Sequence, residues 1–110
     1  MADESEINLR ALLKTPSTKI RLVKFEASWC GPCKALNPIL QRLVDDFDDV
    51  LEVYTVDVDD NSYLANHYQV RSVPTIILHG TEGEFIVRFT GMVRYDQIAI
   101  IINTTFGERS

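Results

Sequence analysis

Two cysteines, three positions apart in Cys30-Gly31-Pro32-Cys33, are the residues of this chain whose types and spacing most directly predict chemistry. At the start of a helix, this spacing brings both sulfurs to one face, where they can join in a short disulfide. Cysteine attacks as its thiolate, and Cys30 falls where a strand ends and a helix begins, beside backbone N–H groups that favour negative charge. We therefore expect Cys30 to attack a substrate disulfide and Cys33 to resolve the mixed disulfide.

The residues next to the cysteines fit the same chemistry. Gly31 is expected to permit the tight turn, and Pro32, which lacks an N–H, is compatible with the first turn of a helix. Both are expected to tune the redox behaviour of the pair. Trp29 is expected to form an apolar wall beside the sulfur and to contact an extended protein substrate.

The flanking segments read as the elements that position this pair. Residues 20–27 are apolar on both faces, as in the centre of a covered sheet, and this predicted strand runs straight into the cysteines. From Cys33 to Phe47 the apolar residues recur at helical spacing, and Pro38 predicts a kink one turn after the cysteines. Residues 1–19 are compatible with either a short strand or a short helix.

The rest of the chain completes an α/β pattern. The pattern predicts strands at 51–58, 75–79 and 84–89, a short helix at 62–68 capped by Asn61 or Ser62, and a last helix at 94–105. We expect a mixed central β-sheet flanked by helices on both faces, formed by one domain spanning residues 1–110.

Composition narrows the class of partner. Hydrophobic residues make up 45% of the 110 residues, and the formal net charge is −5. An acidic chain is a poor binder of nucleic acid or anionic membranes, so we expect protein partners. The acidic start MADESEINLR lacks the layout of a secretion signal, and no apolar run is long enough to span a membrane. The expected location is therefore the cytoplasm.

Several of these residues resemble the signatures of one family. The matching residues are Trp29-Cys30-Gly31-Pro32-Cys33-Lys34, Pro38, Val73-Pro74-Thr75 and Gly91. Over roughly residues 20–106 the chain is similar to the thioredoxin family, in which the surroundings of the cysteine pair tune the cysteine pKa. The resemblance implies the thioredoxin fold and a dithiol-disulfide cycle without a bound cofactor. It also implies disulfide-containing protein substrates, a thioredoxin-reductase-like electron donor and a monomer.

The resemblance also implies a substrate site. The proline matching Pro74 is cis in that family and faces the cysteines, and the backbone of the preceding residue pairs with the substrate chain. Val73 takes that place here, and Gly91 completes the implied substrate-binding set with Trp29. The Gly-Pro pair between the cysteines resembles reducing members of the family, which favours a protein-disulfide reductase.

One position departs from the family. Similar proteins carry a buried aspartate six residues before the first cysteine, where this chain has Lys24, and the lysine that often accompanies it is matched by Thr55. Lys24 and Glu26 share one face of the predicted strand, so we expect that they can form an ion pair beneath the cysteines. A buried, charged Lys24 would stabilise a thiolate, lower the cysteine pKa and raise the reduction potential. A neutral Lys24 would instead act as a base for Cys33, and a purely structural Lys24 would extend its head to solvent.

Two other functions fit parts of the pattern. Two thiolates at this spacing can bind metal, but His67 and His79 are the only histidines and neither has a spacing that closes a tetrahedral site. We expect no metal. A thioredoxin-like fold that serves only as a binding or assembly module is the alternative function, although such a module would not need both sulfurs.

Overall fold

The computed structural model describes residues 3–107 and contains a four-stranded sheet with five helices around it. The elements are α1 (Glu4–Leu13), β1 (Ile20–Glu26), α2 (Gly31–Ala35), α3 (Asn37–Phe47), β2 (Leu51–Asp57), α4 (Ser62–His67), β3 (Thr75–His79), β4 (Phe85–Thr90) and α5 (Tyr95–Phe106). The strand order is β2-β1-β3-β4. β1 is parallel to β2 and antiparallel to β3, and β3 is antiparallel to β4, so the predicted mixed sheet is confirmed.

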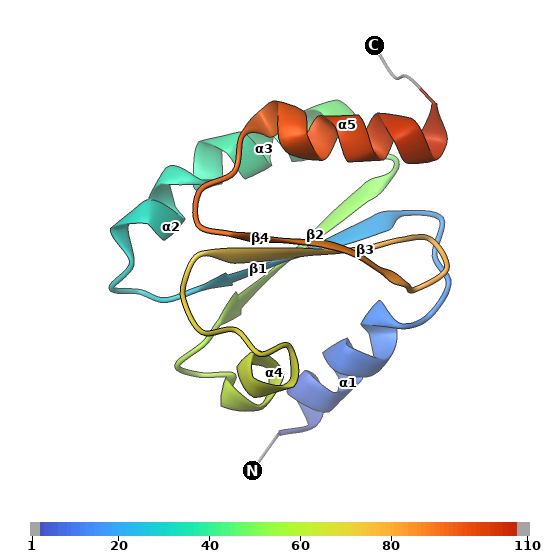
Figure 1. Cartoon of the computed structure of the whole chain (residues 1–110). Helices are drawn as coiled ribbons and strands as arrows, with labels where there is room; N and C mark the ends of the chain where they lie inside the picture. The colour runs from blue at the N-terminus through green and yellow to red at the C-terminus, as the bar shows by residue number, and fades with distance from the viewer. Residues whose placement is uncertain (1–2, 108–110) are drawn as a thin grey trace.

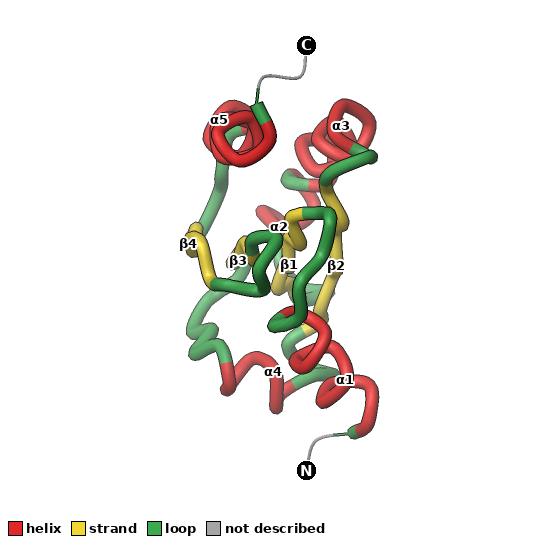
Figure 2. Tube along the Cα trace, turned by 90° about the vertical axis from the view of Figure 1, so that its right-hand side faces the viewer, coloured by secondary structure: helices red, strands yellow, loops and turns green. Residues whose placement is uncertain are grey.

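Helices cover both faces of the sheet, as predicted. α2, α3 and α5 lie on one face, and α1 and α4 lie on the other (Figures 1 and 2). Alternate residues of β1 enter the two cores, because Ile20 and Leu22 pack on the α3 and α5 side whereas Val23 and Phe25 pack on the α4 side. The central strand is therefore buried on both faces, and its end carries the cysteines into a fixed position.

The predicted kink at Pro38 is a complete break between two helices. α2 ends at Ala35, Leu36 caps it, and α3 begins at Asn37 with Pro38 in its first turn. The Leu36 N–H bonds the Cys33 carbonyl at 3.3 Å, a tighter i−3 contact than the helical i−4 bond. The break separates the short cysteine-bearing helix from the long helix that packs on the sheet.

The N-terminal segment, which the sequence left open, is the helix α1, and within residues 3–107 no strand precedes β1. Asp3 caps its start by accepting the Glu6 N–H at 3.0 Å. At its other end, Arg21 Nη1 donates to the Leu12 carbonyl at 2.6 Å and to the Thr15 carbonyl at 3.0 Å. The helix thus has a local N-cap, while a side chain from β1 satisfies carbonyls at its C-terminal end.

The other boundaries lie within one or two residues of those predicted, but the cap of α4 does not match the prediction. Asn61 is its N-cap residue, yet the Asn61 side chain donates to the Asp57 carbonyl at 2.9 Å and caps nothing. Instead, Oε2 of the buried Glu6 accepts the Leu64 N–H at 3.0 Å. A residue of α1 therefore supplies the cap that the local sequence was expected to provide.

Candidate active site

The two cysteines form a disulfide at the start of α2. Their Cα atoms are 5.4 Å apart, and both residues are buried. Cys30 is the N-cap of α2, and its Sγ accepts the Cys33 N–H at 3.2 Å. The same N–H is placed to stabilise negative charge on the Cys30 sulfur once the disulfide opens.

Gly31 and Pro32 occupy the first turn of α2. Pro32 matches its predicted place, where a missing N–H leaves no hydrogen bond unmade. The expected reason for Gly31 is wrong, because its φ is not positive and a Cβ there would meet nothing within 4 Å. Neither backbone conformation nor space requires glycine between the cysteines.

Trp29 lies before the first cysteine and is 70% exposed. Its indole Nε1 donates to Asp59 Oδ2 at 3.0 Å, which fixes one end of the ring while leaving an apolar face open. Asp59 is not among the site residues predicted from the sequence. The signal for it was the parallel pairing of β1 and β2, which brings the segments following Glu26 and Asp57 to the same edge of the sheet.

The loop before β3 reaches the cysteines from another part of the chain. The Val73–Pro74 peptide bond is cis, as the resemblance implied, and Val73 packs against the cluster formed by Ala27 and the two cysteines. The Gly91 N–H donates to the Pro74 carbonyl at 2.8 Å. Gly91 has a φ of +90°, a left-handed conformation that favours glycine. Val73 thus lies against the cysteines, and a backbone hydrogen bond joins its neighbour Pro74 to Gly91.

Lys24 lies on β1, the strand that leads to the cysteines, and has 1% of its surface exposed. Its Nζ donates to Asn37 Oδ1 at 2.7 Å and pairs with Glu26 Oε1 at 2.6 Å. The expected ion pair is therefore present, and the Lys24 head does not reach solvent as a purely structural role was expected to require. Asn37, which the sequence did not single out, is the first residue of α3 and lies four positions after Cys33.

The described residues offer neither a metal site nor a membrane-spanning helix. Within residues 3–107, no three side chains among His, Cys, Asp and Glu gather in a way that could hold a metal ion. None of the helices in this range is both long and apolar enough to cross a membrane.

Comparison with known proteins gives one consistent family. The thioredoxin family model matches residues 3–104. The thioredoxin of Staphylococcus epidermidis is 36% identical over 84 residues, covering 76% of this chain and 80% of that protein. The thioredoxin of Chlorobaculum thiosulfatiphilum is 37% identical over 92 residues, covering 83% of each.

Solved structures give the same result. A mutant thioredoxin from Halobacterium salinarum superposes with a TM-score of 0.75 at 30% identity, covering 96% of this chain and 87% of that one. Mitochondrial thioredoxin 3 from Saccharomyces cerevisiae, in its oxidised form, gives a TM-score of 0.74 at 28% identity, covering 89% and 88%.

The fold and the cysteine pair, with these relatives, define a thiol-disulfide oxidoreductase. The chain belongs to the thioredoxin family. It is a protein-disulfide reductase of the thioredoxin type, and the family implies disulfide-containing protein substrates and a reductase as the electron donor.

Proposed function

We propose that the chain reduces protein disulfides with Cys30 as nucleophile and Cys33 as resolving cysteine. The Cys30 thiolate attacks one sulfur of the substrate disulfide, a mixed disulfide forms, and the other substrate sulfur leaves as a thiolate that takes up a proton. Cys33, after losing its proton, attacks Cys30 Sγ, and the second substrate sulfur is released. Two electrons pass to the substrate, and the Cys30–Cys33 disulfide remains for the donor to reduce.

The observation that carries this proposal is the bond from the Cys33 N–H to Cys30 Sγ. A donor aimed at one sulfur favours the thiolate on that sulfur, which assigns the attack to Cys30. Cys33, three residues into the same short helix, is then in place for the second step. Gly31 and Pro32 are proposed to tune the reduction potential of the pair.

We propose that the substrate chain docks against Trp29, Val73, Pro74 and Gly91. Within residues 3–107, the Val73 N–H and carbonyl form no hydrogen bond, although Val73 packs against the cysteines. An extended substrate segment can satisfy both groups, as a strand added to a sheet edge would. Trp29, directly before Cys30 in the chain, supplies exposed apolar surface.

Lys24 is proposed to tune the redox potential. Its contacts are those of an ammonium, which donates to an amide oxygen and to a carboxylate. Such a charge, little screened because it is buried, favours the thiolate form of a cysteine near it, and its partner Asn37 lies four positions after Cys33.

Single cysteine variants test the proposal. Cys33→Ser, incubated with an oxidised protein such as insulin, is expected to accumulate a mixed disulfide at Cys30, whereas Cys30→Ser forms none. Mass spectrometry of the adduct identifies the linked cysteine. The absence of an adduct in Cys33→Ser, or its appearance through Cys33 in Cys30→Ser, would contradict the assigned roles.

We further propose that residues 1–110 act as one domain, as a monomer in the cytoplasm, without a bound cofactor. The family model spans residues 3–104, which supports one domain. The exposed large apolar side chains come from several different elements and are Ile7, Leu12, Trp29, Phe85, Met92 and Ile100. A reductase also needs a compartment in which thiols stay reduced. Sedimentation of the full chain tests the monomer.

A further inference from the structure

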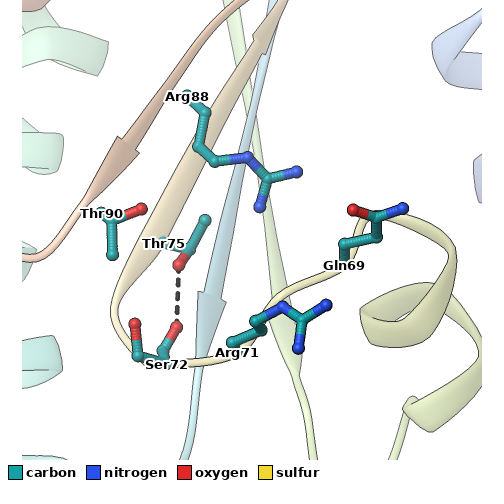
Figure 3. Close-up of a pocket in the computed structure, with 6 residues that line it drawn as sticks. All are labelled: Gln69, Arg71, Ser72, Thr75, Arg88 and Thr90. Carbon is teal, nitrogen blue, oxygen red and sulfur yellow. Dashed lines mark hydrogen bonds between the residues drawn. The ribbon is translucent and has the colours of Figure 1, made fainter.

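A pocket of about 350 Å³ lies beside the edge strand β4 (Figure 3). Its lining residues are Gln69, Arg71, Ser72, Thr75, Arg88 and Thr90. Thr90 pairs with Thr75, and Arg88 pairs with Ile77, a residue of the core on the α4 side. Paired residues of antiparallel strands project to the same face, so the pocket opens on the α4 side of the sheet.

The charge of the pocket is unusual for this chain. The chain has 16 acidic and 11 basic residues, yet the lining contains two arginines and no carboxylate. Within residues 3–107, neither Arg71 nor Arg88 forms an ion pair, although three other arginines do. Two guanidinium groups without a carboxylate partner are therefore available to a negatively charged ligand.

The two arginines are held differently. Arg88 is half-buried, and its Nη2 donates to the Tyr68 carbonyl, which anchors the guanidinium and leaves other N–H groups for a ligand. Arg71 is exposed, and its side chain forms no hydrogen bond within the described part of the chain. Figure 3 shows both guanidinium groups between β4 and the segment that follows α4. One arginine is thus fixed, and the other can adjust to what binds.

Gln69 lines the pocket at a position that usually belongs to glycine. Its φ is +54°, directly after the C-cap Tyr68 of α4. The Val70 N–H bonds the Ala65 carbonyl at 2.8 Å, and the Gln69 N–H bonds the Asn66 carbonyl at 3.1 Å, the pattern of a Schellman motif. A side-chain amide is placed beside the two arginines, although the backbone there favours a residue without a side chain.

The pocket borders the proposed substrate site. Ser72 and Thr75 flank the Val73–Pro74 pair, and Val73 packs against the cysteines. Thr90 precedes Gly91, whose N–H bonds the Pro74 carbonyl. An extended chain advances about 3.3 Å per residue, and Arg71 lies two residues before Val73, so a substrate side chain about two to four residues from the reacting cysteine reaches the pocket.

We infer that this pocket binds the carboxylate of an aspartate or glutamate in the substrate chain, close to the disulfide being reduced. The inference rests on the proposed function. Guanidinium groups bind carboxylates through paired, charge-assisted hydrogen bonds, and hydroxyl and amide donors complete the lining. The pocket therefore directs the reductase toward disulfides in acidic segments.

The test compares two peptides, each closed by one internal disulfide, with glutamate or glutamine three residues outside each cysteine. For the wild type, kcat/KM is expected to be roughly fivefold higher for the glutamate peptide, and to approach equality at high salt. Arg71→Gln lowers this preference, and Arg71→Gln/Arg88→Gln abolishes it. Arg42→Gln makes the same charge change on α3, on the opposite face of the sheet, at a side chain that is 66% exposed, and it keeps the preference.

Equal rates for the two peptides in the wild type, or a preference that survives in the double variant, would overturn the inference. The double variant loses the Arg88 bond to Tyr68. If it does not fold for that reason, the preference of Arg71→Gln for the glutamate peptide is the deciding measurement. Oxidised glutathione is the control substrate. It carries carboxylates on a small molecule, so it distinguishes them from carboxylates in a protein chain. An effect of the arginine variants on glutathione alone would also overturn the inference.

Binding is measured separately from turnover in Cys30→Ser/Cys33→Ser, using the fluorescence of Trp29, the single tryptophan. The glutamate peptide is expected to bind roughly fivefold tighter than the glutamine peptide. Preferential binding without reduction of either peptide would contradict the proposed function and support the pocket. Reduction of both peptides at equal rates would contradict the pocket and support the function.

Discussion

The Nζ atom of Lys24 lies 2.6 Å from Oε1 of Glu26, although Lys24 is 1% exposed and the Glu26 side chain is 31% exposed. The two residues are next neighbours on one face of β1, so the strand supplies both the buried cation and its counterion. Asn37 Oδ1 binds the same ammonium at 2.7 Å from the start of α3. The pair thus connects the central strand to the helix that follows the cysteines.

Lys24→Met is expected to lower the reduction potential of the cysteine couple by about 10–30 mV. The substitution removes a positive charge that favours the thiolate, so the reduced form loses stability relative to the disulfide. The potential is measured by equilibration with glutathione. Lys14→Met, at an exposed lysine after α1, is the surface control and is expected to leave the potential unchanged.

Lys24→Met/Glu26→Gln removes both charges of the pair and separates the charge effect from a packing effect. If the net local charge sets the potential, the potential of the double variant returns most of the way to the wild-type value. The reason is that Lys24→Met alone leaves an unpaired Glu26 carboxylate, which opposes the thiolate. An unchanged potential in Lys24→Met would mean that the lysine serves only the structure.

Glu6→Ala is expected to reduce the free energy of unfolding by about 1–2 kcal/mol. The Glu6 carboxylate caps α4 through the Leu64 N–H, and α4 has no side-chain cap of its own. Glu6→Gln keeps an acceptor oxygen, so its free energy of unfolding is expected to fall by less. Urea denaturation compares these variants with Glu4→Ala, at an exposed position in the same first turn, and an equal loss in Glu4→Ala would argue against a capping role.

Strong local patterns made much of the fold predictable. β1 was recognisable because apolar residues enter both cores, and the break after α2 followed from Pro38, which has no N–H to donate. The form of α1 was not predictable, because its segment is short and only partly apolar. Contacts from Glu6 to α4 and from Arg21 to the end of α1 join it to elements that are remote in sequence.

The active site likewise contains residues that local sequence patterns predict and residues that depend on tertiary contacts. The cysteines and Pro74 carry local signatures, whereas the burial of Lys24 depends on Asn37, whose place is known only once α3 packs on β1. The pocket proposed to bind a substrate carboxylate could not be predicted from the sequence, because Arg71 lies in a loop and Arg88 lies in β4. The register of β3 with β4 is what places Arg88 on the face where the loop lies.

Gln69→Gly is expected to raise the free energy of unfolding by about 1 kcal/mol, because glycine adopts the left-handed conformation of this residue without steric cost. The same change removes an amide from the proposed anion pocket, so it should weaken the preference for the glutamate peptide. Gln69→Ala is the matched control, since it removes the amide but keeps the Cβ and gains no stability. A stability of Gln69→Gly no greater than that of Gln69→Ala would contradict this account.

We expect His79 to make folding stability sensitive to mild acid. Its ring is buried, with Nε2 at 3.3 Å from Tyr68 Oη and Nδ1 at 3.3 Å from the Gly83 carbonyl. Burial lowers the pKa of His79 from its ordinary value of 6.5, and Arg21 and Lys14 add to this effect, while the Gly83 carbonyl and Glu84 oppose it. The unfolded chain therefore binds a proton at a higher pH than the folded chain does.

This difference in pKa predicts that the free energy of unfolding falls as the pH is lowered. Above pH 7 His79 is neutral in both states, but as the pH falls through 6.5 only the unfolded state gains the proton, and stability declines until the folded-state pKa is reached. Urea denaturation between pH 7.5 and 5.5, roughly the range above carboxylate titration, should show this decline in the wild type and a shallower one in His79→Gln. His67→Gln removes a less buried ring whose pKa burial also lowers, so it should flatten the curve less. An equal slope in His79→Gln and the wild type would assign the acid sensitivity to other groups.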